Sequence, residues 1–525
     1  MRVRSTVPGL REGLEIVEVK GRSYLEDPIR RVRVPLDELG ARICEALRGG
    51  PLTPAELTSR VGAGRLESYE RIALLNRHVM LRTPRAAQSV MLHETTEQRL
   101  PPADGTLVHR ANLRHSCTGC GACCTGTDLG PLSDEDVARI QSVDWSPHLP
   151  PEVTPDKWVV EVELQGGDVT KLLGRRHDRC VFLRDDNKCT IHAVAGAAQK
   201  PLMCRQFPHH FIREPESPEI HVAFATECRA WHVAKVDGAS VEDSYGALWE
   251  ILEEKGSAIV LKAPFSVWDG LDWSWKTWRG VRDVQLERLA TASEFSELVD
   301  GIVEPVLQAL ADSMSPHEQD EFFSTRAGWG IPAPPGGSLT GRGAFEAFQE
   351  ASLSINGALG GGLAQLAERY EDAGELEMGR RHLALSDAVH HLFSGQETPR
   401  ALTTPEAFEI WREMALAAVD GHEIAQGDSI LFETGKLVLK LVLAHHDCHL
   451  GVSDGMRARV DDHDVVDRMV RVTKMLRGAL VSALLRRSRK EVVALFLFNT
   501  SVFVRGQAPR ALGLEAATRL PGELR

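Results

Sequence analysis

Cysteine is concentrated in one part of this 525-residue chain. Eight of the ten cysteines lie between residues 117 and 228, and four of them fall within the first eight residues of that stretch. An even distribution would place about two cysteines in a window of that size. A cysteine that only fills a core usually occurs singly, so core packing does not explain this spacing. Closely spaced thiolates are the ligands that soft metals and iron–sulfur clusters require.

The eight clustered cysteines are the candidate metal ligands. They are Cys117, Cys120, Cys123, Cys124, Cys180, Cys189, Cys204 and Cys228. The first three have the C-x2-C-x2-C spacing with which one loop offers three thiolates to a 4Fe-4S cluster, and a remote cysteine would supply the fourth. Gly119 and Gly121 allow such a loop to adopt positive φ values. The sequence identifies no catalytic residue.

Two other chemistries remain open for these thiols. Eight thiolates can form two four-cysteine zinc sites, although the adjacent pair Cys123 and Cys124 does not divide naturally into zinc knuckles. A redox dithiol of the C-x-x-C kind would use two cysteines and leave six without a role. The C-x3-C-x2-C pattern of radical S-adenosylmethionine enzymes is not supported, because its third ligand would fall on Thr127.

The cysteine pattern resembles a known family. The segment Cys117–Cys124 resembles the signature of the zinc- or iron-chelating CxxCxxCC family. Asn187-Lys-Cys189-Thr-Ile-His and Lys200-Pro-Leu-Met-Cys204-Arg-Gln-Phe-Pro resemble its flagellin lysine-N-methylase branch, and Thr226-Glu-Cys228 stands at the place of that branch's last cysteine. His209 departs from the branch, where an arginine often follows the proline. The resemblance covers residues 115–232.

The resemblance implies an iron–sulfur protein that transfers methyl groups from S-adenosylmethionine to lysines of a protein or peptide substrate. No stretch of the sequence locates a methyl-donor site. The glycine-rich stretch 357–362 lacks the preceding strand and the following acidic residue of a dinucleotide-binding motif, and it is interpreted as a helix break. The alternative is a non-enzymatic zinc- or iron-binding module whose flanking domains recognise a protein partner.

The patterns predict a mostly α, multi-domain fold. Short strands within residues 14–34 and three helical patterns before residue 82 suit a small winged-helix unit. The run from Arg22 to Gly62 resembles the winged-helix domain that grips a leader peptide on its strand edge, and a helical cap packed on the cysteine domain is the alternative. Four domains are predicted. They are a winged-helix-like peptide-recognition or cap domain with its linker (1–105, the linker from 84), a loop-rich cysteine-cluster domain (106–235), a helical region with a Trp cluster (236–330), and a linker with a helical C-terminal domain (331–525).

Three smaller groups of residues also need an interpretation. The tryptophans between residues 268 and 278 are expected to seal a domain junction. Arg205 either offsets the charge of a cluster or is an ordinary surface residue. His445–His449 and Asp461–Asp464 are expected to form a solvated helix end and loop rather than a second metal site.

Charge and hydropathy limit the partners. The net charge of −13 argues against general binding to a nucleic-acid backbone. The chain has no run of eighteen apolar residues and no secretory signal at its start. We therefore expect a cytoplasmic protein with reduced thiols, without a membrane or nucleic-acid partner.

Overall fold

The computed structural model shows a mostly α, multi-domain chain with several small sheets, which confirms the predicted fold class. The residues that it describes are 6–19, 21–95, 103–111, 113–115, 117, 119–125, 129–163, 169–177, 179–228, 238–255, 258–268, 270–313, 356–372, 374, 376–393, 402–427, 429–454, 459–460, 462–477, 481–482, 485–486 and 492. The predicted linker within residues 327–342 lies outside them. Two compact units form: unit 1 comprises residues 1–100, 261–280 and 427–431, and unit 2 comprises the remainder.

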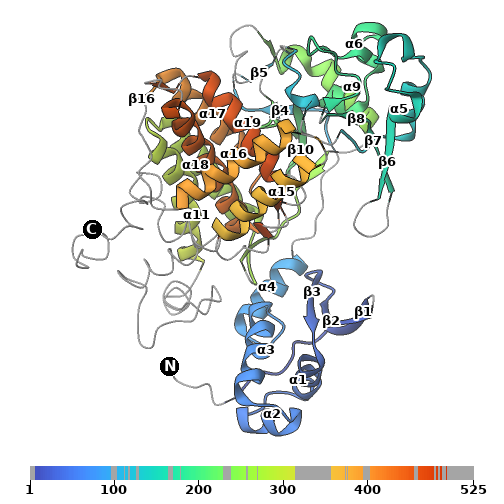
Figure 1. Cartoon of the computed structure of the whole chain (residues 1–525). Coiled ribbons are helices and arrows are strands. Elements are labelled where there is room, and N and C mark those ends of the chain that lie inside the picture. Colours follow the sequence, from blue (N-terminus) through green and yellow to red (C-terminus); the bar gives the residue numbers. More distant parts are fainter. Residues whose placement is uncertain are drawn as a thin grey trace. The chain divides into compact units, whose positions relative to one another are not determined.

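Unit 1 begins with an antiparallel sheet in the order β1-β2-β3, followed by helices (Figure 1). Its elements are β1 (Glu15–Val19), β2 (Arg22–Asp27), β3 (Val32–Leu36), α1 (Glu38–Arg48), α2 (Pro54–Val61), α3 (Arg65–Arg77) and α4 (Pro84–Thr95). Thr53 and Glu56 form a reciprocal capping box at the start of α2, as the sequence pattern indicates. Cys44 of α1 is fully buried, and burial raises its pKa to about 11, so it is a core residue. The predicted linker from residue 84 is wrong over α4, which is helical.

A later segment of the chain completes unit 1. It contains the hairpin β14 (Phe265–Trp268) and β15 (Leu271–Trp273) and the start of α10 (Trp275–Thr291). Asp272 accepts a hydrogen bond from Ser89 of α4 and pairs with Arg30, and its side chain is almost fully buried. All four clustered tryptophans are buried. Their role at a domain junction stays a prediction.

Unit 2 contains a four-stranded mixed sheet in the order β13-β10-β11-β4. Its strands are β4 (Leu107–His109), β10 (His209–Arg213), β11 (Ile220–Phe224) and β13 (Ile259–Val260). The central pair is antiparallel, with Phe211 opposite Val222, and every residue of β11 is buried. Helix α9 (Tyr245–Lys255) packs its apolar residues against this sheet. We call this apolar cluster the sheet core; it includes Phe211, Val222, Phe224 and Cys228.

The cysteine-rich part of unit 2 is built from short elements. They are η1 (Ala122–Cys124), α5 (Asp134–Gln141), β6 (Val159–Glu163), β7 (Val169–Leu173), β8 (Arg175–Arg176), β9 (Arg179–Cys180), α6 (Thr190–Ala195) and α7 (Leu202–Gln206). A second apolar cluster forms among them around Trp145, Phe182 and Ile191. Gly174 lies where an added Cβ would be 1.7 Å from the carbonyl oxygen of Lys157, so only glycine fits this close chain crossing.

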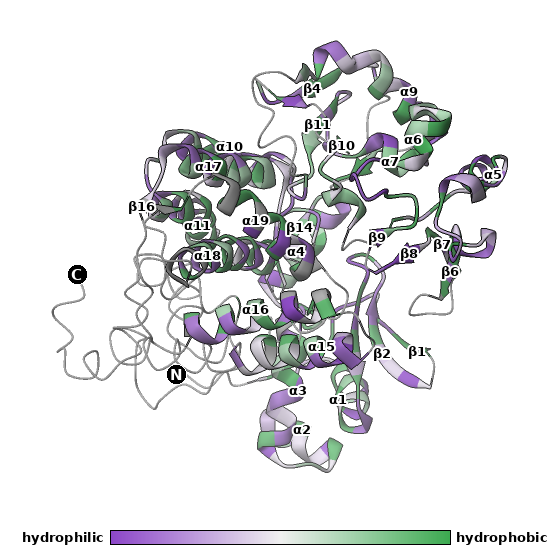
Figure 2. Cartoon of the chain, turned by 45° about the horizontal axis from the view of Figure 1, so that its top comes forward, coloured by the Kyte–Doolittle hydropathy of each residue, from purple (hydrophilic) through white to green (hydrophobic). Residues whose placement is uncertain are grey.

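The described part of the chain from residue 295 onward is mainly helical. They are α11 (Phe295–Asp312), α15 (Gly361–Asp372), α16 (Leu376–Phe393), α17 (Pro405–Asp420), α18 (Ile430–Asp454) and α19 (Asp462–Arg477). In Figure 2 the ribbons of α11 and α18 are largely green, the colour of hydrophobic residues, and nearly every side chain from 430 to 449 is buried. The expected helix break at 357–362 is wrong in detail, because a π-helical turn at Asn356–Gly360 leads directly into α15. Among the described helices, none is both long and apolar enough to cross a bilayer.

Candidate metal centre

Cys123 and Cys124 lie on a tight turn that a glycine makes possible. Gly121 has a φ of 70°, and a Cβ at this position would be 3.0 Å from the side chain of Asn187. The Cys124 N–H donates to the carbonyl of Gly121 at 3.0 Å, and the Thr125 N–H donates to that of Ala122 at 3.3 Å. The two sulfur atoms are 3.6 Å apart. We call residues 121–125 the thiol turn.

Three other cysteines approach the thiol turn from later segments. Thr125 forms a β-bridge with Arg179, which places the turn beside Cys180. A second bridge joins Leu183 to Cys189 and closes the loop between them. The side chain of Asn187 in this loop packs against Gly121. Cys204, on α7, packs against the same apolar cluster as Cys124 and Cys189. We call the five cysteines of this region and their apolar neighbours the thiol core. The five are Cys123, Cys124, Cys180, Cys189 and Cys204.

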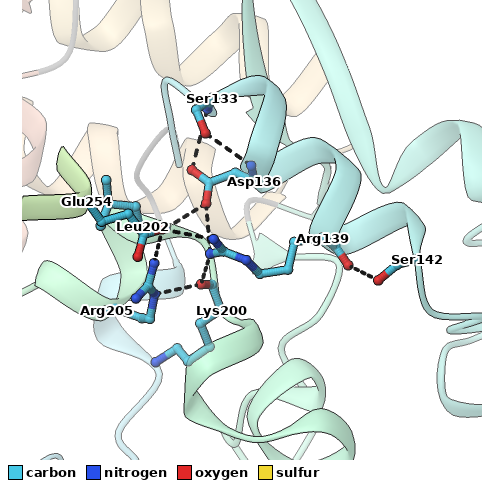
Figure 3. A network of polar contacts seen from close by, with 8 residues as sticks. All are labelled: Ser133, Asp136, Arg139, Ser142, Lys200, Leu202, Arg205 and Glu254. Atoms are coloured by element: carbon cyan, nitrogen blue, oxygen red, sulfur yellow. Dashed lines mark hydrogen bonds and ion pairs between the residues drawn. The ribbon is translucent and has the colours of Figure 1, made fainter. Parts of the chain in front are cut away.

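A polar network holds the helix that carries Cys204 (Figure 3). Asp136 of α5 accepts a hydrogen bond from the backbone N–H of Leu202 at 2.9 Å, at the first residue of α7. Arg139 donates to Glu254 at 2.8 Å and to the carbonyl of Lys200 at 3.3 Å. Arg205 also contacts Glu254 and donates to the same carbonyl at 3.1 Å. This network, here called the clamp, fixes the start of α7 relative to α5 and α9.

Arg205 is one of the residues that form the clamp. Its guanidinium is directed toward Glu254 and the Lys200 carbonyl, as Figure 3 shows. The hydrogen bond from Arg205 lowers the pKa of Glu254 to about 2. The structure therefore gives Arg205 a structural pairing within the clamp, which differs from both interpretations of the sequence.

The electrostatics of the thiol core combine neutral thiols with two nearby cations. Burial raises the pKa of Cys204 to about 12 and raises that of Cys180 as well. The pair on the thiol turn behaves differently: the hydrogen bond with Cys124, helped by the charges of Lys200 and Lys474, lowers the pKa of Cys123. The shared proton raises the pKa of Cys124. A metal cation that binds here would therefore displace protons from buried thiols.

The remaining candidate cysteines lie elsewhere. Cys117 is exposed and Cys120 is half-buried. Cys228 is buried in the sheet core, with its sulfur 3.9 Å from Nε2 of His115. Burial lowers the pKa of His115, and it lowers that of the neighbouring His209 to about 4, so both imidazoles are neutral at pH 7. Of the eight predicted ligands, five therefore lie in the thiol core and one, Cys228, lies in the sheet core. The other two, Cys117 and Cys120, precede the thiol turn in the sequence.

The donor chemistry of the thiol core fits a soft metal. Five thiols from four segments of the chain face one region, and thiolates are the preferred ligands of zinc and of iron–sulfur clusters. In the part of the chain that the structure describes, no three His, Cys, Asp or Glu side chains are already arranged closely enough to hold an ion. Which thiols ligate a metal stays a prediction.

Sequence reasoning missed the two cations of this site. Lys200 lies four residues before Cys204, so its proximity could have been suspected from the spacing. Lys474 lies on α19, far along the chain, and donates to the carbonyl oxygens of Ala122 and Thr125. No sequence signal connects residues so far apart.

The histidine-rich stretch of α18 is buried rather than solvated. His446, Asp447, Cys448 and His449 are each less than a tenth exposed, so the expectation of a solvated helix end is wrong there. Asp447 pairs with Arg468 of α19 at 2.9 Å and also with Arg471. The side chains of 461–464 lie outside the described residues.

A comparison with known protein families matches the segment of the chain that contains the thiol core. Residues 116–229 match the model of the CxxCxxCC family, described as a putative zinc- or iron-chelating domain. No curated protein and no solved structure matches the chain. The resemblance to the chelating family is thus confirmed for this segment, and the flagellin methylase branch stays a prediction.

Proposed function

We propose that the thiol core binds a metal through cysteine thiolates and that an iron–sulfur cluster, of the 4Fe-4S type, is its occupant. The observation that carries the proposal is the grouping of five thiols beside Lys200 and Lys474. Two positive charges suit an anionic metal–thiolate group, because they offset charge that is poorly solvated in a buried site. Cys117 and Cys120 of the C-x2-C-x2-C loop are the other candidate ligands.

Zinc is the second candidate, and the family description favours it as much as iron. A zinc site would be structural: it would join η1, β9 and α7, which come from separate segments of the chain. The chain would then be a non-enzymatic module whose other domains recognise a protein partner.

Anaerobic purification followed by iron, sulfide and zinc analysis distinguishes the two metals. Iron and acid-labile sulfide in equal amounts, with a broad absorption band near ~400 nm, would support the cluster. About one or two colourless zinc ions per chain would support the zinc module. A reduced protein that takes up neither metal would contradict the proposal.

The activity that we propose for the iron form is methyl transfer from S-adenosylmethionine to lysines of a protein or peptide. It rests on the resemblance of the segments around Cys189 and Cys204 to the methylase branch. The three-stranded sheet of unit 1, in the order β1-β2-β3, has two outer strand edges on which an extended peptide could add a strand. Mass spectrometry of lysine-containing peptides, incubated with the reconstituted protein and S-adenosylmethionine, tests for an added methyl group. Calorimetry that detects no S-adenosylmethionine binding to the fully metallated protein would contradict methyl transfer and leave the binding module.

A further inference from the structure

One side chain of α19 contacts the thiol turn directly. Lys474 Nζ donates to the carbonyl oxygens of Ala122 and Thr125, which flank Cys123 and Cys124 in the sequence. The Ala122 carbonyl also accepts the N–H of Thr125, which closes the turn. The ammonium therefore joins two carbonyls of the turn, and a hydrogen bond from a charged donor is stronger than one between neutral groups.

Lys474 is held in place by the rest of its helix. The face of α19 opposite Lys474 is buried, and it carries Val465, Met469 and Val472. Arg471, one turn before Lys474, pairs with Asp447 of α18, and Arg468 pairs with the same carboxylate at 2.9 Å. Because Asp447 is almost fully buried, this contact fixes α19 along the helix that contains the histidine-rich stretch.

We propose that Lys474 is a positioning residue for the metal centre: it fixes the thiol turn before metal arrives and places a positive charge beside the thiolates that bind it. This inference rests on the proposed metal binding. It adds that the C-terminal helical region, and not only the matched segment 116–229, determines the properties of the site. Residues that orient metal ligands through hydrogen bonds typically contribute strongly to metal affinity.

Hydrogen–deuterium exchange of the metal-free, reduced full chain tests the positioning role without any metal. Lys474→Met should speed exchange of the Cys124 and Thr125 amides about tenfold or more, because two charge-assisted hydrogen bonds are lost. Lys474→Arg keeps the charge and should retain most of the protection. Lys436→Met is the matched control, since the Lys436 ammonium pairs with Glu433 of its own helix at 2.6 Å.

Metal titration then tests the effect on the site. Zn²⁺ affinity, measured by competition with a chelating dye, should fall roughly 10- to 100-fold in Lys474→Met and stay unchanged in Lys436→Met. The charge-transfer band of the Co²⁺-loaded protein should shift in Lys474→Met and return toward the wild-type position in Lys474→Arg.

The two measurements separate the possible failures. Unchanged exchange and unchanged Zn²⁺ affinity in a folded Lys474→Met protein would overturn the inference, and so would equal losses in Lys436→Met. If the wild-type chain binds neither Zn²⁺ nor iron with sulfide, the metal proposal fails, and the amide exchange still decides whether Lys474 fixes the turn. Arg471→Met, which removes the contact with Asp447 but keeps Lys474, should give an exchange rate between those of the wild type and Lys474→Met.

Discussion

The sheet core and the thiol core lie in the same unit and contain cysteine in two different settings. In the sheet core, Cys228 packs with Phe211, Val222 and Phe224 beside β10 and β11, two strands that pair with each other over their whole length. In the thiol core, two-residue strands, a 3-10 turn and the short helices α6 and α7 carry five cysteines. Regular strands need no cross-link to hold their geometry, whereas a loop-rich core gains much from one.

The two cores also differ in how their charges are arranged. Next to β10 of the sheet core, Glu214 contacts His422 at 2.8 Å and pairs with Arg282 at 2.5 Å. The negative charge of the Glu214 carboxylate is therefore balanced by the guanidinium of Arg282. The thiol core instead places Lys200 and Lys474 near thiols that burial keeps mostly neutral. The charges of the Glu214 network balance one another, whereas the two lysines beside the thiol core would balance an anionic metal–thiolate group. We therefore expect metal dependence to be confined to the thiol core.

The largest expected effect separates the cysteines of the two cores. Cys123→Ser should lower the metal content at least about tenfold, because it removes a ligand from the thiol turn. Cys228→Ala should retain the wild-type metal content, because Cys228 packs as a small apolar residue in the sheet core. Metal analysis after anaerobic purification measures both. Equal metal loss in the two variants would end the distinction between the cores.

Removing a charge from the network beside the sheet core should cost the next largest amount. Arg282→Met leaves Glu214 and the buried His422 without their cation, and breaking a buried pair in this way costs about 3 kcal/mol or more. The matched control on the same helix is Arg288→Met, whose exposed pair with Glu304 is worth less than about 0.5 kcal/mol. Shifts of the urea midpoint, followed by far-ultraviolet circular dichroism, compare them. A similar small shift in both variants would show that the network adds little stability.

The sequence predicted helices well where a regular apolar periodicity follows an N-terminal capping residue. The helix starting after Thr53 follows directly from the Thr-Pro-x-Glu pattern, and α17 follows from Thr404-Pro with a regular apolar period. The predicted linker at residue 84 failed because a proline also suits the first turn of a helix, as in α4. Burial of 446–449 was missed because tertiary packing against α19, not composition, decides it.

The candidate site was predictable only in part. Thiol spacing located the cysteine domain, because metal chemistry limits how ligands are spaced along a loop. Spacing could not show that Cys228 would join the β10–β11 sheet, because strand pairing is a long-range event. It also could not find Lys474, whose contact joins residues about 350 positions apart. Arg205, which follows Cys204, was interpreted either as compensating the charge of a cluster or as a surface residue, and the structure pairs it with Glu254 instead.

Acid should destabilise the sheet core through Glu214. Burial alone would raise the pKa of this carboxyl, but the hydrogen bond from His422 and the charge of Arg282 outweigh burial and hold it at about 2. Since the pKa is depressed on folding, the stabilisation is complete above the unfolded value of 4.5 and is lost as pH falls toward 2. We expect about 2 kcal/mol to be lost between about pH 5.5 and 3. Urea midpoints across this range should fall less steeply in Glu214→Gln than in the wild type or in the exposed control Glu304→Gln; parallel slopes would contradict the assignment.

The smallest expected effect concerns the clamp beside the thiol core. Asp136→Asn weakens two acceptor contacts of the Asp136 carboxylate, one with the Ser133 N–H in the capping box of α5 and one with the Leu202 N–H, at a cost of about 1–2 kcal/mol. Asp134→Asn, in the same helical turn, is the control, because its carboxylate is exposed and pairs only with Lys171 in the described contacts. The informative measurement is amide exchange at 202–206 with and without Zn²⁺. If metal links α7 to the thiol turn, Zn²⁺ should restore protection in Asp136→Asn; if α7 stays equally unprotected with metal bound, Cys204 is not joined to the centre.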